Sequence, residues 1–188
     1  MIDPRRACAV ILLAEVTMND IRRPEDDRGQ NEIRRLAEIA QHRGIRIAVA
    51  ESLTSGLLAS EVGKGENAGK WFAGGVVAYL YDIKQNVLGV EPNLDPCSPE
   101  CAEQLAAGVR DLMDADLAVS TTGVGGPDPS DGHPPGTVYL GWATSSGVGH
   151  LRLELGDEPE QVLPAAVDAA ITLLADTVNR AEHAGDTP

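Results

Sequence analysis

The chain has 188 residues, of which 43% are hydrophobic, and its formal net charge is −14. This length supports one domain with a hydrophobic core, and the apolar share excludes a disordered chain. The excess of acidic residues argues against general binding of DNA, RNA or anionic membranes, because the chain and their phosphates would repel each other at long range.

The first 30 residues are expected to be an extension or linker ahead of the domain. Two arginines precede the apolar run ACAVILLAEV, but the run is short, is closed by Glu15 and is not followed by a small-residue cleavage site. We therefore interpret it as non-targeting, and it is too short to cross a bilayer. Residues 18–30 are polar and contain Pro24 and Gly29, as linkers often do. Since Met18 offers a second start, residues 1–17 are either an extension or a start-site artefact.

From Asn31 onward, helical and strand patterns alternate. A helix is predicted from Asn31, its N-cap, to Gly44, with Ile33, Leu36, Ala37 and Ala40 on one face. The next predicted elements are a strand at 45–50, a short helix after Ser52, a strand at about 71–79 and a short helix at 82–90. A longer helix then begins at Ser98-Pro99, and its apolar stripe contains Leu105, Val109 and Leu112.

The second half of the chain contains a strand, a loop, a hairpin and a final helix. The strand is predicted at 115–123, buried on both faces, and the loop, rich in Gly and Pro, at 123–136. The two strands of the hairpin are predicted at 137–144 and 150–155, and the helix from Pro159 to about Glu182. The pattern predicts an α/β fold, a three-layer α/β/α sandwich with a mixed, mostly parallel sheet. The domain is expected to span 31–182, and 183–188 to form a tail.

Two polar loops follow apolar strands and are candidates for function. They are Glu51–Gly56 and Gly123–Gly136. In α/β sheets, function gathers beyond the carboxyl ends of strands, and glycines there allow close backbone approach. Neither loop has the spacing of a phosphate or dinucleotide fingerprint. Ser52, at a strand-to-helix turn, is expected to present its hydroxyl at the positive end of a helix, with amides aimed at the same point.

The cysteines and histidines indicate no metal site. Cys97 and Cys101 are four residues apart, Cys8 is distant, and none falls in a metal-ligand pattern with the four histidines, His42, His133, His150 and His183. We predict no metal and interpret the cysteines as reduced thiols of a cytoplasmic protein.

Four motifs occur in a fixed order: AESLTSG, GGVVAYLYDIK, TTGVGGPD and PPGTVY. Together they resemble the C-terminal domain of CinA and its stand-alone relatives, the nicotinamide mononucleotide deamidases, over about residues 32–180. The resemblance implies an α/β/α sandwich and the cofactor-independent hydrolysis of the carboxamide of nicotinamide mononucleotide to nicotinate mononucleotide and ammonia. By position, the family's active-site serine, tyrosine and lysine fall on Ser52, Tyr79 and Lys84.

These residue types suit amide hydrolysis, which needs a nucleophile, a proton acceptor and donors for the developing oxyanion. Lys84 would take the proton of Ser52 if a dry site lowers the lysine pKa, and Tyr79 would relay a proton or donate to the leaving amine. Glu51 is expected to point away from the ammonium, toward backbone amides. Taken singly, the serine, tyrosine and lysine are more often an N-cap, a rim tyrosine and a solvated lysine; jointly, at the family spacing, they favour a site.

The residues expected to help hold the substrate lie in the two loops. They are Glu51, Thr54, Ser55, Gly56, Thr122, Gly123, Gly125, Gly126 and Asp128. For Thr54 the alternative is a helix cap, and for Thr122 and Asp128 it is a turn residue. The expected partners are a small-molecule pyridine nucleotide and further copies of the chain in a homo-oligomer, with no nucleic acid and no membrane.

The chain departs from the family pattern at several positions. Ser55 replaces the first glycine of T-G-G, Asn67-Ala68-Gly69 replaces a Gly-Ala/Ser-Ser segment, Gly125 replaces an alanine and His133 replaces a lysine. These departures sustain a second hypothesis, a non-catalytic nucleotide-binding or competence-associated module that kept the pocket and lost the substrate. The presence of Ser52, Tyr79 and Lys84 favours the enzyme.

Overall fold

The computed structural model of the protein describes residues 28–184, so the expectations for 1–27 and 185–188 lie outside the described residues. A five-stranded sheet in the order β2-β1-β3-β4-β5 runs through the domain. Its strands are β1 (Ile47–Glu51), β2 (Phe72–Val77), β3 (Leu117–Gly123), β4 (Thr137–Thr144) and β5 (Gly147–Glu154). β1 pairs in parallel with β2 and β3, whereas β4 is antiparallel to β3 and β5. The predicted mixed sheet is confirmed, with parallel and antiparallel pairings equally frequent.

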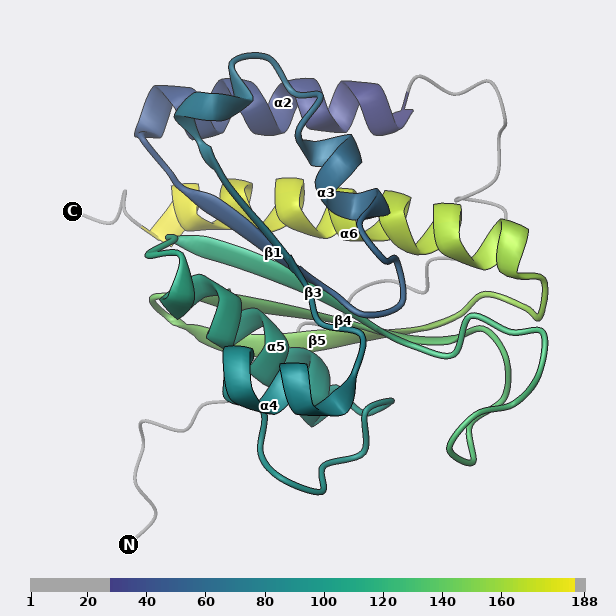
Figure 1. Ribbon diagram of the computed structural model, residues 1–188. Helices are drawn as coiled ribbons and strands as arrows, with labels where there is room; N and C mark the ends of the chain where they lie inside the picture. Colours follow the sequence, from purple (N-terminus) through teal and green to yellow (C-terminus); the bar gives the residue numbers. More distant parts are fainter. Residues whose placement is uncertain (1–27, 185–188) are drawn as a thin grey trace, which may run out of the picture.

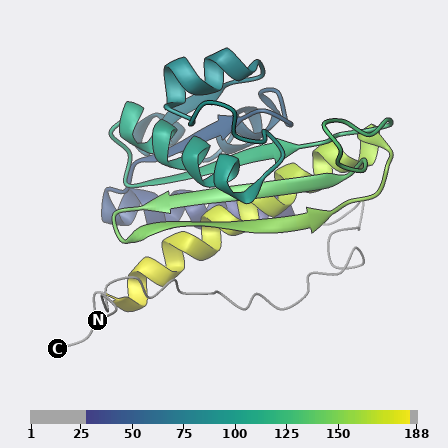
Figure 2. The same ribbon diagram turned by 90° about the horizontal axis from the view of Figure 1, so that it is seen from below.

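Helices cover both faces of this sheet (Figures 1 and 2). One face is covered by α2 (Arg28–Arg43), α3 (Leu57–Val62) and the long α6 (Pro159–Ala184), and the other by α4 (Tyr81–Leu88) and α5 (Pro99–Leu112). A short 3-10 helix, η1 (Ala68–Lys70), precedes β2. The α/β/α sandwich predicted from the alternating pattern is therefore confirmed.

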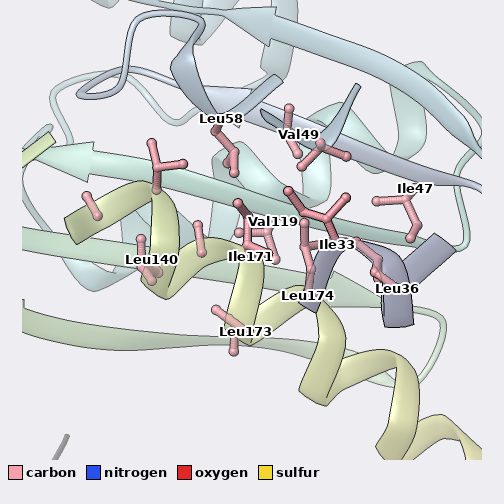
Figure 3. Close-up of a cluster of buried hydrophobic side chains, with 14 of the residues drawn as sticks. Ile33, Leu36, Ile47, Val49, Leu58, Val119, Leu140, Ile171, Leu173 and Leu174 are labelled. Atoms are coloured by element: carbon pink, nitrogen blue, oxygen red, sulfur yellow. The ribbon is translucent and has the colours of Figure 1, made fainter. Parts of the chain in front are cut away.

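The larger hydrophobic core fills the space between the sheet and α2, α3 and α6 (Figure 3). The predicted stripe of α2 is buried as expected, with Leu36 and Ala40 fully inaccessible. It meets Ile47 and Val49 of β1 and Ile171 of α6. Because one face of each element is apolar, burying these faces against one another drives the layers together.

The second core, on the α4 and α5 side, contains many small residues. Gly141 of β4 lies directly under α5, where a Cβ on this glycine would be 2.1 Å from the carbonyl oxygen of Ala102. The hydroxyl of Ser120 donates to the same carbonyl at 2.5 Å. The helix therefore approaches the sheet closely only because position 141 has no side chain.

Two helices differ from the sequence prediction, one in its first residue and one in the burial of its last residue. The first helix begins at Arg28, so Asn31 lies within it and is not its N-cap. Packing of α2 against α6 stabilises the additional turn, because tertiary contacts outweigh local capping signals. In α5, Leu105 and Val109 are buried as predicted, but Leu112, in the last helical position, is 54% exposed.

By length and composition, the stretch Pro159–Asn179 of α6 is apolar enough to cross a membrane, with a mean hydropathy of 1.3. Half of it is buried within the domain, where Val162, Ala170 and Leu174 are fully inaccessible core residues. This is the composition expected of a central helix that packs between a sheet and another helix.

We expect Gly141→Ala to lower the free energy of unfolding by at least about 2 kcal/mol, because its Cβ would collide with the backbone of α5. Gly69→Ala is the matched control, since nothing lies within 4 Å of a Cβ there. It should change the free energy of unfolding by less than about 0.5 kcal/mol. Urea unfolding measures both values, and equal stability of the two variants would contradict the close approach.

Candidate active site

The turn after β1 and the loop after β3 lie at the same end of the sheet (Figure 1). β1 and β3 are parallel neighbours, with Glu51 in register with Thr121. The amide of Ser52 extends this pairing by donating to the carbonyl of Thr121 at 2.9 Å. The first residue after β1 is thus held at the carboxyl end of the sheet, the usual position of functional residues in this architecture.

Ser52 and Lys84, 32 residues apart in the chain, are brought into direct contact. The Nζ atom of Lys84 lies 2.7 Å from the Oγ atom of Ser52. The same Nζ donates to the carbonyl oxygens of Ala78 at 2.5 Å and Tyr79 at 3.2 Å. These two carbonyls accept two N–H bonds, so the third tetrahedral position of the amine points at the serine hydroxyl. A neutral amine would present its lone pair there and accept the serine proton.

Lys84 is a buried lysine, only 2% exposed. Burial lowers the pKa of Lys84, because the charged ammonium loses its hydration, whereas Coulombic interaction with Cys101 acts in the opposite direction. The Cys101 thiol is itself buried, and its pKa is raised to about 11, so it stays uncharged at neutral pH. Within residues 28–184, no carboxylate lies within ion-pair distance of Lys84. The site therefore favours the neutral amine, the form that a general base requires.

Glu51 points away from Lys84, as expected, and its carboxylate binds the start of α3. One oxygen accepts from the amides of Gly56 and Leu58 and the hydroxyl of Thr54, at 2.9, 3.0 and 2.6 Å. The other accepts from the amide of Ala59 at 2.8 Å. The N-cap residue of α3, Gly56, provides no side-chain cap, so Glu51 supplies these acceptors instead.

The expectation that the helix N-terminus aims its amides at the Ser52 hydroxyl was wrong. The amides of Gly56, Leu58 and Ala59 are occupied by Glu51, and that of Leu57 donates to the Thr54 carbonyl. The physical reason is that the described residues place no cation beside the buried carboxylate of Glu51, so its oxygens accept from the nearest available donors.

Three amides closer to Ser52 are not engaged in this way. Among the described residues, the amides of Leu53, Thr54 and Ser55 have no hydrogen-bond acceptor. They follow the serine directly in the chain, as the amides of an oxyanion site often do. These three are therefore the local backbone donors that remain available to a developing negative charge.

Tyr79 contacts the Ser52–Lys84 pair through its backbone only. Its carbonyl accepts from Lys84, but its side chain is 68% exposed. In the described part of the chain its hydroxyl has no hydrogen-bond partner. A proton-transfer role for Tyr79 therefore requires the side chain to turn toward Ser52, and it stays a prediction.

Of the residues expected to hold the substrate, those with buried hydroxyls are engaged within the protein. The Thr54 hydroxyl bonds Glu51 and lies 2.8 Å from the hydroxyl of Thr121. Thr122 is 1% exposed and donates to the carbonyl of Pro96 at 2.6 Å. This burial favours positioning roles for the side chains of Glu51, Thr54 and Thr122. Direct substrate contact by any of them stays a prediction.

The glycines of the second loop lie next to the first loop. A Cβ on Gly125 would be 3.2 Å from the side chain of Leu53, which places the two loops in contact. Gly123 and Gly126 have φ values of +147° and +85°, and a Cβ on either would meet backbone within 2.5 Å. Asp128 is exposed at the rim. The structure thus brings this loop to the Ser52 turn, and its substrate contacts stay a prediction.

Sequence reasoning overlooked Thr121. Its hydroxyl lies in hydrogen-bond contact with that of Thr54, and its carbonyl accepts from the Ser52 amide, so two hydrogen bonds join Thr121 to the turn after β1. The sequence pattern that could have identified Thr121 is the run Ser-Thr-Thr at the end of a buried strand. Side chains alternate between the faces of a strand, so Thr121 faces the opposite side of the sheet from Thr122, which was selected.

Residues 28–184 contain no group of three or more His, Cys, Asp and Glu side chains arranged to hold a metal ion. Cys97 and Cys101 are both free and buried. Burial also raises the pKa of Cys97 to about 11, with a further contribution from Asp95. The Nε2 atom of His133 lies 2.7 Å from a carboxylate oxygen of Asp95.

Comparison with known proteins agrees with this architecture. Residues 30–178 match the family model described as the CinA C-terminal domain. The chain belongs to this family. A CinA superfamily protein from Escherichia coli has 29% sequence identity and a TM-score of 0.76, over 84% of this chain and 95% of that one. A second, from Klebsiella pneumoniae 700603, has 27% identity and the same TM-score, over 81% and 98%.

Longer relatives of this CinA domain include two with the provisional name competence-damage inducible protein. The protein from Bacillus subtilis strain 168 is 46% identical over 113 residues, and that from Geobacillus kaustophilus is 47% identical over 110 residues. These matches cover 58% and 56% of this chain. Each covers 27% of the relative, so the chain matches about a quarter of the length of those proteins.

Two departures from the CinA pattern preserve backbone conformation. Ser55 and Asn67 have φ values of +51° and +54°, in the left-handed region where glycine is favoured. Both stand where the family pattern has glycine. Asn visits this region more readily than most residues. At Ser55 the added hydroxyl lies on the loop surface, 3.4 Å from the carbonyl oxygen of Ser52. Both positions therefore have a left-handed backbone and carry a polar side chain.

We expect Glu51→Gln to lower the free energy of unfolding by about 2–3 kcal/mol, since an amide nitrogen would face buried donors that it cannot accept from. Glu61→Gln, in the helix α3 whose first amides Glu51 accepts, is the matched control, because its partner Lys64 is exposed and such pairs contribute little. It should change stability by less than about 0.5 kcal/mol. Urea unfolding measures both, and an unchanged Glu51→Gln variant would contradict the role of Glu51 in the turn.

Proposed function

We propose that this CinA domain hydrolyses the carboxamide of nicotinamide mononucleotide to nicotinate mononucleotide and ammonia. One observation above all supports the proposal. The hydroxyl of Ser52 lies 2.7 Å from the amine of a buried lysine whose pKa is lowered and which has no carboxylate beside it in the described chain. Such a pair is suited to attack on a carbonyl carbon. The choice of substrate comes from the motif resemblance.

In the first half of the proposed reaction, Ser52 Oγ attacks the carboxamide carbon as its proton moves to Lys84 Nζ. The carbonyl oxygen becomes an oxyanion, for which the free amides of Leu53, Thr54 and Ser55 are the nearby donors. The intermediate then collapses as Lys84 returns the proton to the nitrogen, so that ammonia leaves and an ester with Ser52 remains.

In the second half, water replaces ammonia in the same position. Lys84, neutral again, takes a proton from the water, whose oxygen attacks the ester carbon. The bond to Ser52 Oγ breaks, and Lys84 returns the proton to the serine. The sum is one amide and one water converted into one acid and ammonia. Nucleophile and base both come from the chain, so the proposal gives no role to a metal or cofactor.

Features near Ser52 and Lys84 are compatible with a pyridine nucleotide as the substrate. The carbonyl of Tyr79 accepts from Lys84, and its exposed side chain has an aromatic face, a group that attracts a cationic pyridinium. The glycine-rich loop from Gly123 to Gly126 contacts the Ser52 turn through Gly125 and Leu53, which supports a role for this loop in holding the substrate. Free, buried thiols at Cys97 and Cys101 support a cytoplasmic location for the reaction.

The function is tested by measuring ammonia release from nicotinamide mononucleotide, with nicotinamide and glutamine as control substrates. We expect release from the mononucleotide alone and none with Ser52→Ala. The hydroxyl of Ser52 bonds only Lys84 among the described residues, so its loss should reduce stability by about 1 kcal/mol at most. Ser60→Ala, at an exposed serine of α3, should retain full activity. Turnover by folded Ser52→Ala would contradict the nucleophile, and binding of the mononucleotide without turnover by the wild type would favour the non-catalytic module.

The general-base role of Lys84 is tested by Lys84→Arg, because arginine keeps the charge and does not lose its proton. We expect kcat to fall by at least about 100-fold, the lower end for losing a general base. Wild-type kcat/KM should rise with pH as the lysine deprotonates, with a midpoint below its ordinary 10.5. The exposed Lys70→Arg is the control and should match the wild type. A folded Lys84→Arg variant within a few-fold of wild-type kcat would leave Lys84 as a binding residue.

A further inference from the structure

The β3–β4 loop, residues 123–136, is closed at its base and extends beyond the sheet (Figure 1). At the base, the amide of Val124 donates to the carbonyl of Thr137 at 2.8 Å. At the tip, Ser130 and His133 exchange backbone hydrogen bonds at 3.1 and 2.9 Å. These contacts join parts of the loop to one another, and they do not fix its tip relative to the rest of the domain.

One side-chain contact joins the tip to another part of the chain. The Nε2 atom of His133 lies 2.7 Å from a carboxylate oxygen of Asp95, which is 38 residues away in the sequence. An ionised carboxylate only accepts hydrogen bonds, so the imidazole is the donor. Among the described residues, no other hydrogen bond links positions 127–133 to the remainder of the domain. The position of the tip therefore depends on this pair.

Asp95 is itself held in place, so it can serve as an anchor. Its second carboxylate oxygen accepts from the amide of Cys97 at 2.8 Å, and its carbonyl accepts from the hydroxyl of Ser98 at 2.7 Å. The Ser98 hydroxyl also accepts from the amide of Cys101, as the N-cap of α5. The carboxylate that contacts His133 is thereby fixed relative to a helix of the core.

Residues 95–98 also contact both ends of the β3–β4 loop. The hydroxyl of Thr122, just before the loop, donates to the carbonyl of Pro96 at 2.6 Å. The thiol of Cys97 lies 3.8 Å from the carbonyl oxygen of Thr137, just after the loop. The same short segment therefore meets the loop at its start, at its end and at its tip. The contact at the tip is partly exposed, so it can be changed without disturbing the core.

We propose that His133 is a positioning residue, which acts through Asp95 to hold the β3–β4 loop where the amide substrate of the Ser52 site requires it. The loop adjoins the Ser52 turn, because a Cβ on Gly125 would lie 3.2 Å from the side chain of Leu53. A displaced tip changes the shape of the loop beside the substrate and leaves the catalytic serine and lysine in contact. The effect on the reaction rests on the function proposed above.

A loosened loop changes KM more than kcat. When only a fraction of the molecules has the binding-competent loop, the apparent affinity falls by that fraction, while bound substrate reacts as before. We expect His133→Ala to raise KM for nicotinamide mononucleotide about three- to fivefold, the scale of one partly exposed ion pair, with kcat within about twofold of the wild type. His133→Lys keeps a donor for Asp95 and should restore the wild-type KM.

The matched control is a second histidine–carboxylate pair of the same length. The Nδ1 atom of His150 lies 2.7 Å from a carboxylate oxygen of Glu103, and this pair joins β5 to α5 instead of holding the loop. His150→Ala should therefore retain the KM of the wild type. An equal rise of KM in His150→Ala and His133→Ala would overturn the proposal, and so would an unchanged KM in His133→Ala.

An Asp95→Ala background separates positioning from direct contact with the substrate. If His133 acts through Asp95, then His133→Ala should raise KM no further once Asp95 is absent. If His133 instead binds the substrate itself, the double variant should show the full additional rise. That second result would overturn the positioning role.

Hydrogen exchange tests the loop without any substrate. Exchange at residues 128–132 should be faster in His133→Ala than in the wild type, whereas His133→Lys and His150→Ala should match the wild type. Equal exchange in His133→Ala and the wild type would show that the pair does not hold the loop. A wild type that releases no ammonia would contradict the proposed reaction, and the exchange comparison would then decide the role of His133 by itself.

Discussion

The turn that presents Ser52 depends on one buried carboxylate. Glu51 ends a strand that is buried along its whole length, and its oxygens accept the amides that begin α3. This helix has six residues and a glycine as its N-cap, so its own propensity would not maintain it. The bonds to Glu51 fix where α3 begins relative to β1. Since Ser52 lies between the strand and the helix, both of its neighbours in the chain are held in place.

Lys84 shows the opposite arrangement, a buried amine with no carboxylate beside it in the described part of the chain. The sequence contains 29 acidic residues, so a partner would have been easy to supply, yet the neighbouring carboxylate of Glu51 is committed to amides. Taking an ammonium out of water without a counter-charge costs folding free energy, and the group responds by favouring its neutral form. Proteins retain such local costs mainly where chemistry requires them. A central feature of the site is therefore that Glu51 binds backbone amides, whereas Lys84, among the described residues, is left beside Ser52 without a counter-charge.

The end of β3 connects the layers around this pair. Ser120 bonds α5, Thr121 bonds the turn after β1, and Thr122 bonds the segment before α5. Three successive hydroxyls thus tie three separate parts of the chain to one buried strand. Each of these buried hydroxyls has a hydrogen-bond partner within the protein. The rigidity of the site comes from these contacts as much as from the apolar cores on either side of the sheet.

The sequence by itself determined the order and type of the elements, because apolar periodicity reflects which face of each helix or strand is buried. Motif spacing also selected Ser52 and Lys84, which the structure places in contact. Only the tertiary structure decided which groups the α3 amides bind, that the Tyr79 side chain faces solvent, and that Thr121 supports the turn. These depend on side-chain directions and on partners far apart in the chain, which local sequence patterns do not encode. The same holds for the pKa of Lys84, since its burial results from the packing of α4 and α5 against the sheet.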